Sequence, residues 1–153
     1  MVARTKYLAA QEFVTRLGAT EADGLLGQGG RDNRTLDLDR AATVLLAADN
    51  LIDGYVSARY KTGFAKIPDL LKDIAFDIAR YKLRGQGGQS SNMSEVVRQR
   101  YEDAIAQLKD ISNGRMTLDS NGDGSQPEPD THAQTVKGYM PESRINKALE
   151  GWS

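Results

Sequence analysis

Residues 52–81 contain Ile52-Asp53-Gly54-Tyr55-Val56-Ser57-Ala58-Arg59-Tyr60 and then, after a short gap, Pro68-Asp69-Leu70-Leu71-Lys72-Asp73-Ile74-Ala75-Phe76-Asp77-Ile78-Ala79-Arg80-Tyr81. Both stretches carry apolar residues three and four positions apart, which predicts helices with a hydrophobic face. Pro68 is favoured in the first turn of a helix, so the gap predicts a short loop. Carboxylates and arginines also stand where such faces usually carry apolar side chains. These residues therefore predict a packed helical hairpin with buried charge.

Working back from this hairpin, residues 38–60 predict one central helix about 35 Å long. One apolar stripe along it comprises Leu38, Ala41, Ala42, Leu45, Ile52 and Val56, and a second comprises Val44, Ala47, Leu51, Tyr55 and Ala58. A helix that is apolar over more than half of its circumference must be covered on two sides. Either it is the middle helix of a bundle, or the stripe with Val44, Leu51 and Tyr55 contacts another subunit.

Two carboxylates fall on or beside the first stripe, at Asp49 and Asp53. A buried carboxylate without a partner costs several kcal/mol or becomes protonated, so ion pairs are expected. Arg59 and Arg80 are the candidate partners, in a structural role. The alternative is that Asp49 lies at a hydrated rim and needs no partner.

The helix that begins at Pro68 has one apolar face, and Phe76 and Leu83 lie away from it. A single exposed phenylalanine is common on soluble proteins and needs no special explanation. In a protein that forms a ring, these two residues are instead candidates for contact with a neighbouring subunit.

Further helices and loops complete the predicted bundle. An N-terminal helix is expected over residues 7–17, a short helix over 20–26, and flexible glycine-rich loops over 24–34 and 85–91. Asn92 and Glu95 have the spacing of a helix-capping box, and Asn113-Gly114 marks the end of the helix that follows. The expected fold is all-α: a small bundle of four main helices with flexible loops.

The composition is that of an ordinary soluble protein, with 39% hydrophobic residues, 27% charged residues and a net charge of −1. The near-zero charge gives no general attraction to nucleic acid or to anionic membranes. The chain has no cysteine, its start lacks the apolar run of a signal peptide, and no window approaches the ~20 apolar residues of a membrane span. We expect the protein to be made in cytoplasm-like conditions, and we expect no association with a membrane.

A domain boundary is expected near residue 119. Residues 1–118 carry 17 basic and 15 acidic residues, whereas residues 119–153 carry 3 and 6 and open with a run of Ser, Asn, Gly, Pro and Asp. We interpret 119–135 as a flexible linker and 136–153 as a C-terminal arm with Tyr139, Met140, Ile145, Leu149 and Trp152 as contact residues. Such a short arm must pack on its own domain or on a partner, and both remain open.

Motifs for catalysis or cofactor binding are weak. The run that begins at Asp119 resembles the opening of a calcium loop, but its twelfth position is Asp130 rather than glutamate and Pro127 and Pro129 interrupt it. The only histidine, His132, falls in the linker, so the sequence does not favour a catalytic triad or a metal site with several histidine ligands. We expect no enzyme activity, no metal and no cofactor.

The three helical stretches also carry a family resemblance. Residues 52–60, residues 68–81, and Val97-Arg98-Gln99-Arg100-Tyr101-Glu102-Asp103-Ala104 resemble the consecutive helices of the small head–tail connector (adaptor) proteins of Mu-like tailed bacteriophages. The resemblance covers roughly residues 5–118. It implies a structural virion protein that forms a ring, expected to be a dodecamer, below the portal at the phage neck. It further implies contacts with the portal and with a tail-side neck or tail terminator protein, and passage of DNA through the lumen without sequence readout.

Two alternatives to this function remain open. One is a tail-completion protein at an adjacent joint of the neck, because a fold resemblance does not decide which joint is occupied. The other is a small regulatory module that binds calcium or nucleic acid, which would show calcium-dependent order in its tail or salt-sensitive DNA binding.

Overall fold

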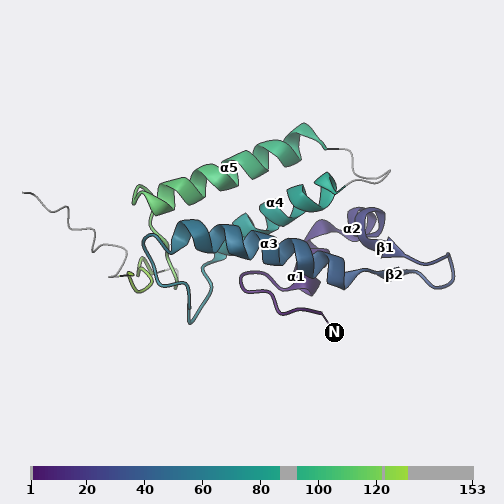
Figure 1. The fold of residues 1–153 in the computed structure, drawn as a ribbon, viewed down its shortest axis with the longest axis horizontal. Coiled ribbons are helices and arrows are strands. Elements are labelled where there is room, and N and C mark those ends of the chain that lie inside the picture. Colours follow the sequence, from purple (N-terminus) through teal and green to yellow (C-terminus); the bar gives the residue numbers. More distant parts are fainter. Residues whose placement is uncertain (1, 87–92, 122, 131–153) are drawn as a thin grey trace, which may run out of the picture.

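The computed structural model describes residues 2–86, 93–121 and 123–130, and within them the fold is a helical bundle (Figure 1). The helices are α1 (Ala10–Leu17), α2 (Ala19–Leu26), α3 (Leu38–Val56), α4 (Asp69–Gly85) and α5 (Glu95–Ser112). The strands β1 (Gly27–Gln28) and β2 (Thr35–Leu36) form a two-residue antiparallel ribbon. The predicted all-α class is confirmed, with α2 as the short extra helix.

Helix α3 is the middle helix of the bundle. It packs against α1, α4 and α5, and α4 and α5 also pack against each other. Figure 1 shows the long helices α3, α4 and α5 running beside one another, with α1 and α2 toward one end of the bundle. Most of the first predicted stripe is fully buried, including Ala41, Leu45, Ile52 and Val56. The small side chains of α3 let its neighbours approach closely, and the larger ones fill the core.

Two helices are shorter than the sequence predicts. Helix α1 begins at Ala10 rather than residue 7, and α3 ends at Val56 rather than residue 60. The backbone at Ala9 is extended, so α1 begins only at Ala10. The preceding residues Lys6 and Tyr7 are held against α3, because their backbone N–H groups donate to the Asp49 side chain. Beyond α3 the chain tightens into a turn that buries Tyr60. Both boundaries lie at tertiary contacts.

The first glycine-rich segment, expected to be flexible, instead includes the hairpin of β1 and β2. The Arg34 guanidinium donates to the Asp23 side chain, to the Asp23 carbonyl and to the Gly29 carbonyl. A Cβ atom at Gly27 would overlap this guanidinium, and Gly29 has a φ of 83°, which favours glycine. The glycines therefore let the hairpin close around Arg34. In Figure 1 it projects from the end of the bundle.

The start of α5 also differs from the prediction. Its N-cap is Ser94, whose Oγ accepts a hydrogen bond from the Val97 N–H at 3.2 Å. The predicted cap, Asn92, lies outside the described residues, as does most of the second glycine-rich segment. Among the described helices, none combines the length and apolar character that crossing a membrane requires.

Candidate functional site

Three of the residues predicted to contact another subunit lie inside the bundle. Val44, Phe76 and Leu83 are buried, so the prediction that they form a free surface is wrong. The Phe76 ring packs on Phe13 of α1, with ring centroids 5.6 Å apart. Helix α1 thus covers part of the side of α4 that the local sequence pattern leaves without a partner, at Phe76 and at Asp73, which pairs with Arg16. These side chains stabilise the subunit and are unavailable to a neighbour.

Other apolar side chains remain accessible. Leu51 and Tyr55, from the second predicted stripe, are half-buried and stay candidates for contact with a partner. The exposed large hydrophobic residues of the described chain are Val2, Leu46, Met93 and Val96. Val96 has 65% of its surface exposed, and Met93 lies close to it in sequence at the start of α5. The predicted arm contacts, Tyr139, Met140, Ile145, Leu149 and Trp152, lie outside the described residues.

Asp49 and Asp53 bind the N-terminal segment, not the arginines that the sequence suggests. The buried carboxylate of Asp49 accepts the backbone N–H of Lys6 at 2.7 Å and that of Tyr7 at 3.2 Å. Asp53 forms an ion pair with the Lys6 ammonium at 2.9 Å and accepts a hydrogen bond from the Tyr7 hydroxyl. Asp49 is therefore buried rather than at a hydrated rim, and its partners are not Arg59 and Arg80.

The electrostatics of this pair follow from burial. Burial raises the pKa of Asp49 above its usual value, although the N–H groups of Lys6 and Tyr7 oppose the shift. Burial also raises the pKa of the Tyr7 hydroxyl, and the Asp53 carboxylate that accepts its hydrogen bond adds to the effect. The arrangement fastens residues 5–9 to α3. It is a structural contact, because each acidic oxygen is directed at a donor of the same subunit.

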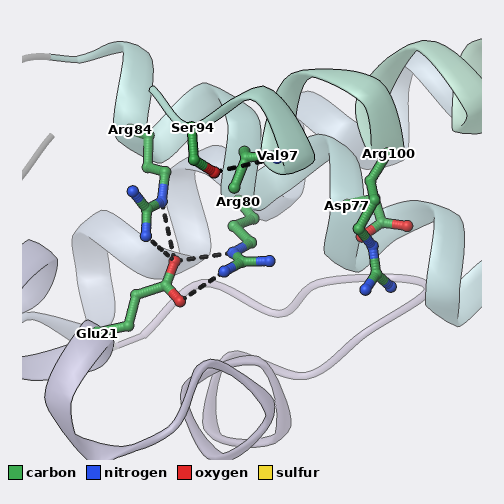
Figure 2. Close-up of polar contacts among 7 residues, drawn as sticks. All are labelled: Glu21, Asp77, Arg80, Arg84, Ser94, Val97 and Arg100. Atoms are coloured by element: carbon green, nitrogen blue, oxygen red, sulfur yellow. Dashed lines mark hydrogen bonds and ion pairs between the residues drawn. The ribbon is translucent and has the colours of Figure 1, made fainter. Parts of the chain in front are cut away.

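Arg80 instead takes part in a cluster that joins α2 to α4 (Figure 2). Its guanidinium donates two hydrogen bonds of 2.8 Å to the two carboxylate oxygens of Glu21. Arg84, one turn further along α4, donates to the same carboxylate at 3.0 Å. Burial alone would raise the pKa of Glu21, but the hydrogen bonds and charges of Arg80 and Arg84 outweigh it and lower the pKa.

A second ion pair, also drawn in Figure 2, joins α4 to α5. Arg100 donates to Asp77 at 2.9 Å, and burial raises the pKa of Asp77 despite this partner. The remaining predicted ion-pair residue, Arg59, lies with its guanidinium 5.5 Å from the centre of the Tyr60 ring. The charged side chains thus join neighbouring elements of one subunit.

Tyr60 anchors the segment that follows α5. Its hydroxyl donates to the Gln126 side chain at 3.1 Å and accepts the Leu118 N–H at 3.4 Å. The backbone of Tyr60 pairs with Pro129, and Lys61 N–H donates to the Glu128 carbonyl. The first part of the predicted linker is therefore packed against the end of α3.

The calcium-like run lies within this packed segment. The Asp119 carboxylate accepts the backbone N–H groups of Asn121 and Gly124, and Asp123 accepts that of Ser125. These oxygens shape turns. Across the described residues, no three His, Cys, Asp or Glu side chains are grouped in a way that could hold a metal ion. His132 lies outside the described residues.

We expect Tyr60→Phe to loosen residues 118–130. The variant removes the hydroxyl and leaves the Leu118 N–H and the Gln126 side chain without this partner, at a cost of about 1 kcal/mol. Hydrogen exchange of the backbone amides in residues 118–130 should accelerate, while amides of α4 stay protected. Tyr55→Phe, near the end of α3, is the matched control because no contact of its hydroxyl is part of this anchor. Equal exchange in both variants would contradict the role of Tyr60.

Sequence reasoning missed several residues that organise this surface. Glu21, Lys6 and Tyr7 are the partners of predicted ion-pair residues, yet they lie 59, 47 and 42 positions away from the groups they bind. Nothing in the local pattern identifies such pairs. The signal available is only that buried charges on α3 and α4 require partners.

Comparison with known proteins identifies the family. The family described as "Bacteriophage Mu, Gp36" matches residues 7–137, which include every helix of the bundle. The Mu-like prophage FluMu protein gp36 of Haemophilus influenzae is 28% identical over 100 residues, which cover 65% of this chain and 67% of that protein. The chain therefore belongs to the bacteriophage Mu Gp36 family.

Proposed function

We propose that this protein is a structural component of the phage particle, a head–tail connector that forms a ring below the portal and joins the DNA-filled head to the tail. The observation that carries the proposal is the family match to a Mu phage protein across the whole helical domain. The polar clusters of the described residues join elements of one subunit, and exposed apolar side chains such as Val96 are left to contact other molecules. Adhesion, rather than catalysis, is the mechanism.

A ring needs heterologous contacts, in which one face of a subunit meets a different face of its neighbour. The described surface offers two separate apolar regions for such a contact. One is the half-buried pair Leu51 and Tyr55 on α3, and the other is Met93 and Val96 at the start of α5. Two distinct patches on one subunit suit a closed ring. The portal and a tail-side neck protein would then bind the two rims, with DNA passing through the lumen.

Imaging of purified virions tests this function. A map of the neck should contain a ring of this helical bundle between the portal and the tail, and mass spectrometry should detect the protein in washed particles. A pull-down with the purified portal should retain the full-length chain. A ring at the next joint along the tail would favour a tail-completion protein instead. Absence of the protein from mature particles would overturn any structural role.

Val96→Glu tests the proposed subunit contact. Val96 is mostly exposed, so the variant should fold normally. A charge buried in a contact between subunits should lower incorporation into particles by about tenfold. Incorporation is measured by quantitative mass spectrometry of purified particles in a complementation assay. Ala106→Glu, an exposed position on the same helix, is the matched control and should incorporate normally. Normal incorporation of Val96→Glu would exclude this patch from the interface.

A further inference from the structure

Beyond Asp39, the exposed positions of α3 carry no charge. Leu46, Ala47, Asn50, Gly54 and Ala58 are exposed on one side of α3 and the turn that follows it, and we call these residues the uncharged face. Leu46 is one of the few exposed large hydrophobic residues of the described chain. The exposed residues of α5 are, by contrast, mostly charged: Glu95, Arg98, Arg100, Glu102, Asp103 and Lys109. A face without charge on a protein with 27% charged residues is typical of a surface that another segment covers.

The path of the chain identifies the segment that can reach this face. The Asp130 N–H donates to the Arg59 carbonyl at 2.9 Å, so the last described residue is held beside the carboxyl end of the uncharged face. Residues 131–153 continue from that point. From Leu46 to Ala58 the face is about 18 Å long at the rise of a helix. Twenty-three residues, at up to about 3.3 Å each when extended, are long enough to run back along all of it.

The sequence of this segment suits an uncharged, partly apolar surface. Ile145, Leu149 and Trp152 follow one another at spacings of four and three residues, which predicts one continuous apolar edge. A segment this short cannot bury such residues by itself. We propose that residues 136–153 dock on the uncharged face of α3 in the same subunit, with these three side chains against Leu46, Ala47 and Gly54. The inference does not depend on the proposed function, because it concerns the isolated chain.

Trp152 is the only tryptophan of the chain and reports on the docking directly. In the full-length protein its fluorescence should be blue-shifted and protected from acrylamide, independently of protein concentration. Ala47→Glu places a charge at the centre of the contact and should lower the docking equilibrium constant by about tenfold or more. The emission should then shift to the red and quenching by acrylamide should approach that of free tryptophan. Circular dichroism confirms that the helices of the variant persist.

Ala106→Glu is the control, since it places the same charge on an exposed position of α5. It should leave the emission unchanged. A second test uses the absence of native cysteine: Ala47→Cys with Leu149→Cys should form a disulfide within one chain. Exposed Trp152 in the wild-type protein, or protection that Ala47→Glu does not change, would overturn the proposal. Protection that depends on concentration, or disulfides only between chains, would assign the face to a second copy and would also overturn it.

Discussion

Asp49→Ala should be the most destabilising of the polar substitutions in this protein, with a loss of about 3 kcal/mol in the free energy of unfolding. The carboxylate is 4% exposed and accepts two backbone N–H groups, those of Lys6 and Tyr7. Alanine cannot accept either, and each orphaned donor costs about 1–3 kcal/mol when it is buried. Residues 5–9 should detach from α3 and expose Tyr7 and Leu8, which are buried in the core.

Urea denaturation measures this loss, and hydrogen exchange at the Lys6 and Tyr7 amides locates it. Asn50→Ala, the next residue on α3, is exposed and should change stability by less than about 0.5 kcal/mol. The loss of stability in Asp49→Asn should lie between the losses in Asp49→Ala and Asn50→Ala. The asparagine amide keeps one acceptor oxygen but presents a donor to the second N–H group. A loss in Asp49→Ala no larger than that in Asn50→Ala would show that the segment is not fastened through this carboxylate.

Glu21→Gln is the second large effect, with an expected loss of about 2–3 kcal/mol. The wild-type carboxylate is 16% exposed and binds the guanidinium groups of both Arg80 and Arg84. Glutamine removes the negative charge between two cations and can accept with only one oxygen, so their mutual repulsion is no longer compensated. The contact between α2 and α4 should weaken, as measured by urea denaturation. Glu12→Gln removes an exposed ion pair with Arg16 and should cost no more than about 0.5 kcal/mol.

The two variants should respond to pH in opposite directions. The pKa of Glu21 is lowered by folding, so its stabilisation is present above its unfolded pKa of about 4.3 and is lost as the pH falls through the folded value. The difference in unfolding free energy between the wild type and Glu21→Gln should therefore become smaller as the pH falls. The pKa of Asp49 is raised, so its titration stabilises the fold at low pH and this contribution is lost as the pH rises through the folded value.

The difference between wild type and Asp49→Ala should accordingly grow as the pH falls from 7 toward about 4. Unfolding free energies at a series of pH values between these limits check both trends on the same wild-type protein. Parallel trends for the two variants would contradict the opposite directions of the pKa shifts, and hence the assigned environments of the two carboxylates.

The long helices were predictable because their pattern is local. The apolar spacing in α3, α4 and α5 fixes one face of each helix, and Pro68 marks where a helix can begin. The same local reasoning failed at helix ends and in the glycine-rich segment. The hairpin of β1 and β2 depends on Arg34 reaching back to Asp23, and the segment before α1 is held against α3 by the hydrogen bonds from Lys6 and Tyr7 to Asp49. Each requires a contact that periodicity does not encode.

The sequence by itself determined the all-α class, the apolar core faces and the family, since these depend on residue types at short, regular spacings. Only the tertiary structure decided which faces stay free and which charges pair. Phe76, away from the main apolar face of its own helix, is buried because α1 covers it, and Asp49 and Arg80 find partners 40 or more residues away. The physical reason is that burial of a side chain and the identity of its partner depend on how the helices pack, whereas helix formation depends mainly on neighbours along the chain.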